Sequence, residues 1–147
     1  MIIRKRDRRN QLILIVDADK VSVKMTFTAL KGFIGQNSFR VEQAENALEV
    51  HCAIQQERDY YGRYPALILI DPRVQGLKQA DLVSELKEQY PSIPKVLCTS
   101  AANRRIHKES LDKKDLLFWL PRPWDGLYQA EMIRETLGIY QDESLTY

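Results

Sequence analysis

Four short polar segments carry the residues in this 147-residue sequence that could do chemistry, and each of them follows an apolar run, either directly or after one proline. They are Asp17-Ala18-Asp19, Asp71-Pro72-Arg73, Thr99-Ser100-Ala101 and Arg122-Pro123-Trp124-Asp125. Carboxylate oxygens suit a hard divalent ion such as Mg²⁺. A hydroxyl and a fixed cation suit the oxygens of a phosphoryl group. The residue types therefore point to metal-assisted phosphoryl chemistry if the fold brings the four segments together.

Each segment also has a plainer interpretation when it is taken alone. Asp17 or Asp19 could cap the helix that follows the first apolar run. Asp71-Pro72 is typical of a turn or helix start, because proline is favoured at the first helical position. The hydroxyls and the arginine could be ordinary loop and surface residues. The joint arrangement at one edge of a sheet is what favours a shared site over four separate plain roles.

The apolar runs that precede these segments predict the strands of a parallel sheet. The runs 12–16, 66–70, 96–98 and 116–120 are strand-length, and none of them alternates polar with apolar residues. This is the pattern of strands that are buried on both faces. A weaker run at 39–42 alternates and predicts an edge strand.

Amphipathic patterns between the runs predict helices, which alternate with the strands along the chain. The expected helices are 21–33 with an end at Gly35, 47–55, 82–90 closed by Pro91, a short helix at 104–111, and 128–138. The alternation predicts an α/β fold, a flavodoxin-like doubly wound five-stranded parallel sheet of (βα)5 type with strand order 2-1-3-4-5. The carboxyl ends of its strands meet at one edge, which would bring the polar segments together.

Composition is consistent with one soluble domain. Hydrophobic residues make up 44% and charged residues 29%, which excludes a disordered tail, a collagen-like fibre and a membrane span. We expect a basic arm at 1–10, the domain at 11–139 and a short tail at 140–147. Cys52 and Cys98 lie in apolar stretches and are predicted to be buried, reduced thiols. With no secretory signal in the sequence, a cytoplasmic protein is expected.

Charge is concentrated in the arm. The net charge is +2, and the segment 4–9 contributes five positive residues and one negative. The remaining chain therefore has 17 positive and 19 negative residues, a net charge of −2. A mildly acidic body argues against nucleic acid as the partner. No membrane partner is expected either.

With these segments in place, residues 11–139 resemble a receiver domain of the response-regulator type (CheY-like). Four stretches carry the resemblance. The run ending in Asp17 resembles the first strand and its acid, and the run ending in Asp71 resembles the phosphoacceptor strand. Residues 97–101 resemble the fourth strand with its switch hydroxyl. Residues 120–125 resemble the Lys-Pro-Phe segment, with Trp119 at the position of the switch aromatic residue.

The resemblance implies a function in two-component phosphorelay signalling. A histidine kinase or phosphotransfer protein would donate a phosphoryl group to Asp71. Mg²⁺ would be bound by Asp17, by Asp71 and by the backbone carbonyl of Arg73, with Asp19 as a further candidate. The domain would signal through protein contacts and would not itself be an enzyme.

The resemblance also implies a switch. Proline spacing favours Thr99 as the switch hydroxyl, whereas the following Ala101 favours Ser100, and both stay open. Arg122 stands at the lysine position, and Trp119 would turn inward after phosphorylation. The face formed by the fourth helix, fifth strand and fifth helix would then bind a downstream protein. A homodimer through the same helices stays open.

Three departures from the family pattern bear on this function. Ala18 replaces the second acid after the first strand, and Asp19 compensates only if the loop bends differently. Arg122 replaces the lysine, and a planar guanidinium is not equivalent to a compact ammonium at a tight site. Val74-Gln75 replaces the usual Met-Pro. We therefore expect Mg²⁺ binding to be weak or lost.

Two alternatives follow. The first is a pseudo-receiver that keeps the fold and binds a protein partner without phosphorylation. The second is a haloacid-dehalogenase-type phosphatase, because residues 16–19 also resemble the nucleophile motif of that family. Against the phosphatase, no paired acids or Gly-Asp follow a later strand.

Overall fold

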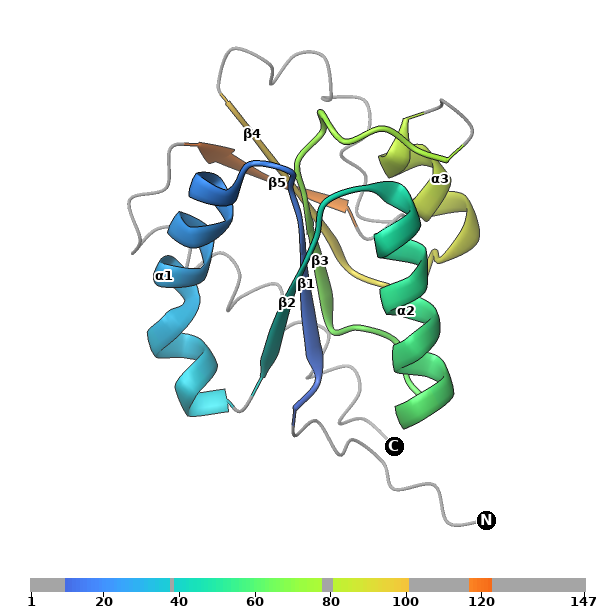
Figure 1. The fold of residues 1–147 in the computed structure, drawn as a ribbon, viewed down its shortest axis with the longest axis horizontal. Helices are drawn as coiled ribbons and strands as arrows, with labels where there is room; N and C mark the ends of the chain where they lie inside the picture. Colours follow the sequence, from blue (N-terminus) through green and yellow to red (C-terminus); the bar gives the residue numbers. More distant parts are fainter. Residues whose placement is uncertain (1–9, 38, 78–80, 101–116, 123–147) are drawn as a thin grey trace.

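The computed structural model describes residues 10–37, 39–77, 81–100 and 117–122, with residues 29–37, 99–100 and 117–122 described by their backbone. Its elements are β1 (Leu12–Val16), α1 (Lys20–Asn37), β2 (Arg40–Ala44), α2 (Ala47–Tyr61), β3 (Leu67–Ile70), α3 (Leu82–Gln89), β4 (Lys95–Ser100) and β5 (Leu117–Arg122). The strands form one parallel sheet in the order β2-β1-β3-β4-β5 (Figure 1). The predicted strand order is confirmed.

The sheet is covered on both faces. Figure 1 shows α1 on one face and α2 and α3 on the other. All five residues of β1 are buried, and they alternate between two apolar clusters. Leu12, Leu14 and Val16 pack with residues of α2 and α3, whereas Ile13 and Ile15 pack with the cluster on the α1 side. This alternation explains why the strand sequences are apolar without interruption.

The ends of α2 are set by local chemistry. The side chain of Asn46 caps the first turn by accepting the backbone N–H of Glu49 at 2.9 Å. Gly62 ends the helix with φ of 69°, a left-handed conformation that glycine adopts without strain. The helix is thus longer than the predicted 47–55. Its last turn carries mostly polar and tyrosine residues, which have no apolar period.

Two smaller predictions were wrong. Gly35 does not end α1, which continues to Asn37, because a helix interior tolerates glycine at a cost of about 1 kcal/mol per residue. Cys52 is exposed, although Cys98 is buried as expected. The buried stripe of α2 runs through Ala47, Val50, Ile54 and Glu57, and position 52 falls outside it.

A buried lysine fixes the turn between α3 and β4. Lys95 has no exposed surface. Its Nζ donates to the carbonyl oxygens of Tyr90 at 2.6 Å and of Ile93 at 2.8 Å. It therefore satisfies carbonyls at the end of α3 while its alkyl chain packs in the core.

The predicted helices at 104–111 and 128–138, the arm before residue 10 and the tail at 140–147 lie outside the described residues. Among the helices that the structure does describe, none is long and apolar enough to cross a membrane.

Candidate functional site

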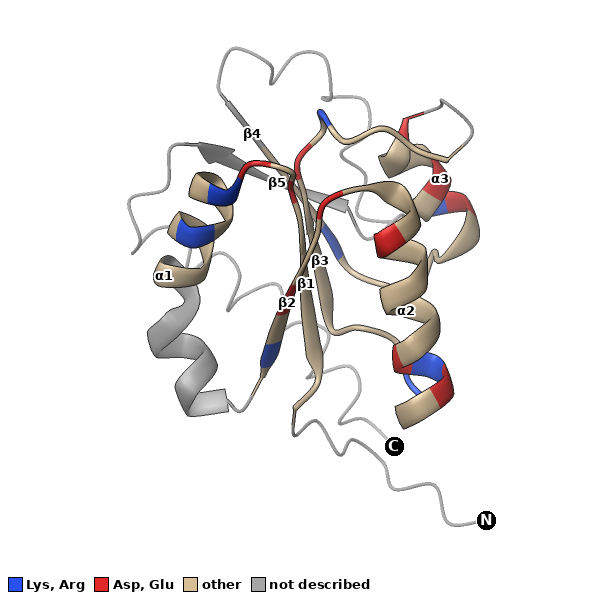
Figure 2. Ribbon diagram, in the orientation of Figure 1, with Lys and Arg blue, Asp and Glu red and all other residues tan. Residues whose placement is uncertain are grey.

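Asp17 and Asp71 lie side by side at the carboxyl end of the sheet. Each follows the last residue of its strand, and Val16 of β1 pairs with Ile70 of β3. The backbone N–H of Asp71 donates to the carbonyl of Val16 at 2.9 Å. Asp17 is 1% exposed and Asp71 is 3% exposed. Acidic positions therefore gather at this edge of the sheet, as the sequence predicts (Figure 2).

Asp17 is fixed by backbone pairing beyond β1. Its N–H donates to the carbonyl of Ala44 at 3.0 Å, and its own carbonyl accepts from Nε2 of Gln43 at 2.9 Å. Its carboxylate Oδ1 accepts the backbone N–H of Asp19 at 2.8 Å. The carboxylate is thus held at the strand end and bends the loop into α1.

Asp19 serves as the cap of α1. Its carboxylate accepts the N–H of Val21 at 3.0 Å and the hydroxyl of Ser22 at 3.2 Å. These bonds, that of Val21 first, lower the pKa of Asp19. The plainer of its two expected roles is confirmed, and a role in metal binding stays a prediction. The adjacent Ala18 is exposed and offers no side-chain oxygen.

Arg73 closes over the Asp71 carboxylate. Its backbone N–H donates to Oδ1 of Asp71 at 2.8 Å, and its Nε lies 3.1 Å from both carboxylate oxygens. Its Nη2 donates to Oδ2 at 2.6 Å. The hydrogen bond with Asp71, then the negative charge of Asp71 and the charges of Asp17 and Asp19, raise the pKa of Arg73. Burial of Arg73 opposes that rise.

Sequence reasoning identified Arg73 only through its backbone carbonyl and missed the contact of its side chain. The available signal was the spacing. In Asp-Pro-Arg the arginine follows the carboxylate by two residues, so a turn can fold the guanidinium back onto it.

The donors at this edge fit Mg²⁺ in kind, since buried carboxylate oxygens are its preferred ligands. Asp17, Asp71 and the predicted Arg73 carbonyl would hold the ion. Within the described ranges, no group of three or more His, Cys, Asp or Glu side chains is arranged to hold a metal. Both oxygens of Asp71 already accept from the guanidinium. The ion and Arg73 would therefore contend for the same carboxylate.

The backbones of β4 and β5 bring the remaining predicted residues to the same edge. Leu97 pairs with Ile70, so Thr99 stands one position past the level of Asp71. Ser100 pairs with Arg122, and both end their strands at this edge. Trp119 lies further back, opposite Leu97. For Thr99, Ser100, Trp119 and Arg122 the structure describes the backbone alone. Their roles in the switch therefore stay predictions.

Another buried carboxylate lies at the opposite end of the sheet, and sequence reasoning missed it. Glu57 of α2 is 2% exposed and accepts from Nη2 of Arg40 at 2.5 Å and from Nε of Arg63 at 3.3 Å. Both guanidinium groups lie over the ring of Tyr61, 5.1 and 4.7 Å from its centre. Residues so far apart in sequence give no periodic signal.

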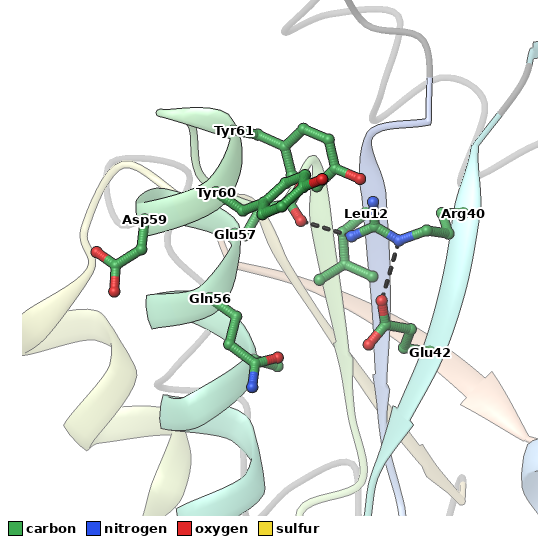
Figure 3. Close-up of a pocket in the computed structure, with 9 residues that line it drawn as sticks. Leu12, Arg40, Glu42, Gln56, Glu57, Asp59, Tyr60 and Tyr61 are labelled. Atoms are coloured by element: carbon green, nitrogen blue, oxygen red, sulfur yellow. Dashed lines mark hydrogen bonds and ion pairs between the residues drawn. The ribbon is translucent and has the colours of Figure 1, made fainter.

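Figure 3 shows the open pocket beside this cluster, about 520 Å³ in volume. Its lining residues are Leu12, Arg40, Glu42, Ala53, Gln56, Glu57, Asp59, Tyr60 and Tyr61. The pocket opens where β1 begins, so it is separate from the site of Asp17 and Asp71, where β1 ends.

Comparison with known structures identifies the architecture. The signal receiver domain of an HD domain-containing protein from Pseudomonas fluorescens matches over 100% of both chains, with 19% identity and a TM-score of 0.72. The chain has the fold of CheY-like receiver domains. The receiver domain of NtrX from Brucella abortus matches 86% of this chain and 98% of its own, with 21% identity and a TM-score of 0.63.

A third receiver, the N-terminal domain of a two-component response regulator from Bacteroides fragilis, covers 86% of this chain and 96% of its own. It is 21% identical, with a TM-score of 0.67. No protein-family model and no curated protein matches the sequence. In the receiver fold, the carboxyl edge that holds Asp17 and Asp71 is where the strand order reverses and where ligands of doubly wound sheets bind.

Proposed function

We propose that this chain is a receiver domain that accepts a phosphoryl group on Asp71 and signals through protein contacts. One observation carries the proposal. The Asp71 carboxylate is buried at the end of the central strand β3, beside the buried Asp17, in a receiver fold. The donor would be a histidine kinase or phosphotransfer protein, and the domain would act as a signalling module without a catalytic cycle of its own.

The transfer is a nucleophilic displacement at phosphorus. A carboxylate oxygen of Asp71 attacks the phosphorus of a phosphohistidine on the donor, and an O–P bond forms as the P–N bond breaks. The electron pair stays on the imidazole nitrogen, which takes a proton from solvent. Mg²⁺, when bound by Asp17 and Asp71, supplies positive charge that offsets the repulsion between the carboxylates and the phosphoryl oxygens.

Some residues of this chain position Asp71 for the transfer, and others would contact the phosphoryl group after it. Asp17, fixed by its backbone bonds, keeps a second carboxylate next to the nucleophile. Arg73 has to release an oxygen of Asp71 before that oxygen can attack, because its lone pairs are engaged. The new phosphoryl charge would then attract the hydroxyl of Thr99 or Ser100 and the cation of Arg122.

Intact-mass spectrometry with acetyl phosphate tests this function, in the presence of Mg²⁺ and after its removal with a chelator. We expect a Mg²⁺-dependent gain of one phosphoryl group in the wild type and none in Asp71→Asn. The matched control is Asp81→Asn, which removes the same charge from the exposed cap of α3 and should still be phosphorylated. A gain that persists in Asp71→Asn would contradict the proposal.

A second candidate, a pseudo-receiver, is favoured by two specific features. Ala18 offers no carboxylate to the acidic pocket, and the guanidinium of Arg73 binds both carboxylate oxygens of Asp71. In that case the fold would bind its partner without phosphorylation. No mass gain at saturating Mg²⁺, in a folded protein, would favour this candidate.

A further inference from the structure

Arg73 and Asp71 form an ion pair in which the guanidinium contacts both carboxylate oxygens. A metal ion at this site would need the same oxygens. Three guanidinium contacts of 2.6 to 3.1 Å reach the two carboxylate oxygens, and the backbone N–H of Arg73 adds a fourth at 2.8 Å. The carboxylate is 3% exposed. Arg73 thus supplies positive charge to a carboxylate that is otherwise largely removed from water.

The guanidinium of Arg73 interacts electrostatically with all three aspartates near the end of the sheet. Asp17 and Asp19 act electrostatically on Arg73 in addition to Asp71. Two buried carboxylates at neighbouring strand ends repel each other unless a cation stands between or beside them. A guanidinium is one such cation, and a divalent ion is another. With Ala18 in place of an acid, the site has less negative charge to offer to a divalent ion.

Arg73 is also positioned to leave. Its side chain is 67% exposed, and it follows Asp71 by only two residues in a loop. Rotation of the side chain into water would therefore release the carboxylate from the guanidinium without moving a strand or a helix. Water would solvate the released guanidinium, which lowers the free-energy cost of its leaving the buried carboxylate.

We infer that Arg73 is a built-in counter-ion that competes with a divalent cation for the Asp71 carboxylate. Bound to Asp71, it neutralises the site in the absence of metal. Displaced from Asp71, it opens both the metal position and the nucleophilic oxygen. This inference rests on the proposed function. In it, the metal affinity of the site depends on the side chain of Arg73 as well as on the carboxylates of Asp17 and Asp71.

Mn²⁺ binding measures this competition directly, by electron paramagnetic resonance of the free ion. The proteins are the wild type, Arg73→Ala, and Arg58→Ala as a control for the loss of one arginine charge. Arg58 lies on α2 and contacts Tyr64, away from the acids. We expect Arg73→Ala to bind Mn²⁺ about tenfold more tightly than the wild type, a difference of about 1.4 kcal/mol. Arg58→Ala should change the affinity by less than about twofold.

Equal or weaker Mn²⁺ binding by Arg73→Ala, or no binding by either protein, would overturn the inference. Because Arg73 is mostly exposed, the variant should fold, which thermal unfolding checks. The outcome is separable from the phosphorylation assay. A wild type that gains a phosphoryl group while Arg73→Ala binds no tighter would refute the counter-ion alone. Tighter binding in a protein that gains no phosphoryl group would refute the phosphoacceptor role alone.

Discussion

Asp71 and Glu57 are both buried carboxylates that accept from arginine, yet they differ in how they are held. Asp71 follows the last residue of β3, at the carboxyl edge of the sheet, and the Arg73 side chain that contacts it is 67% exposed. Glu57 lies near the amino end of β1, and its partners Arg40 and Arg63 are 30% and 19% exposed. Both sites therefore bury a carboxylate, but the arginine that pairs with Asp71 is far more exposed than the two that pair with Glu57.

The origin of the arginines is the second difference. Arg40 comes from β2 and Arg63 from the loop after α2, so Glu57 ties a strand, a helix and a loop together. Arg73 comes from the same loop as Asp71. Breaking the Glu57 cluster would disturb three elements, whereas opening the Asp71 pair requires only a side-chain rotation.

The comparison teaches that burial of a carboxylate does not by itself indicate function. We expect the cross-linking carboxylate to be structural, because its charge is neutralised by two mostly buried arginines from other elements. The carboxylate with a local, exposed cation can exchange that cation for a ligand. Four substitutions test this distinction. Their expected effects on the free energy of unfolding are given from the largest to the smallest.

Glu57→Gln should have the largest effect on stability. It leaves two partly buried guanidinium groups without their carboxylate, which we expect to lower the free energy of unfolding by about 3 kcal/mol. Denaturant titration followed by circular dichroism measures the change. Glu42→Gln is the matched control, since Glu42 pairs with the same Arg40 but is 47% exposed, and it should cost less than about 1 kcal/mol. Equal losses would show that Glu57 is not a cross-link.

Arg40→Ala should have an intermediate effect. It removes the 2.5 Å contact to Glu57 and the stacking on Tyr61, while Arg63 still neutralises the carboxylate. We expect a loss of about 2 kcal/mol in the same titration. Arg58→Ala, which removes a comparable stacking arginine from Tyr64 at the surface, should cost about 0.5 kcal/mol. A loss as small as that of the control would place Glu57 with the exchangeable sites.

Asp71→Asn should change stability by less than about 1 kcal/mol. The loss of the ion pair with Arg73 is offset, because removal of one buried charge relieves the repulsion with Asp17. Phosphorylation should nevertheless disappear in the mass assay. A destabilisation comparable to that of Glu57→Gln would assign Asp71 a structural role instead.

Arg73→Ala should lower the free energy of unfolding by less than about 1 kcal/mol, because most of the arginine side chain is already in water, although the buried Asp71 loses one counter-ion. The same variant is the one expected to bind Mn²⁺ more tightly. Unfolding titrations without metal and with saturating Mn²⁺ show both effects, since ligand binding to the folded state adds stability. A large loss without metal would mean that Arg73 holds the loop in place.

The sequence was sufficient for the fold because strands buried on both faces must be apolar throughout. The continuous runs at 12–16 and 66–70 therefore marked β1 and β3, and the alternation with helices determined their parallel order. The positions of Asp17 and Asp71 followed, because a residue directly after a parallel strand has a fixed place at the sheet edge.

The sequence was not sufficient for the arginines. The contact of Arg73 depends on a rotamer in a turn, which no periodic pattern encodes. The contact of Arg40 with Glu57 joins residues 17 positions apart through the tertiary packing of α2 beside β2. For Asp19 the residue type allowed both a cap and a metal ligand, and only the geometry of α1 showed the cap.

If the cation on Asp71 is exchangeable and the cations on Glu57 are not, the two sites must respond differently to added Mg²⁺. The Nε–H groups of Arg73, Arg40 and Arg63 all donate to carboxylates, so one nitrogen–hydrogen correlation spectrum observes both regions during a Mg²⁺ titration. We predict that the Arg73 signal shifts and exchanges faster with water as Mg²⁺ is added, while those of Arg40 and Arg63 stay unchanged. An Arg73 signal that does not move at any Mg²⁺ concentration, or three signals that move together, would contradict the account.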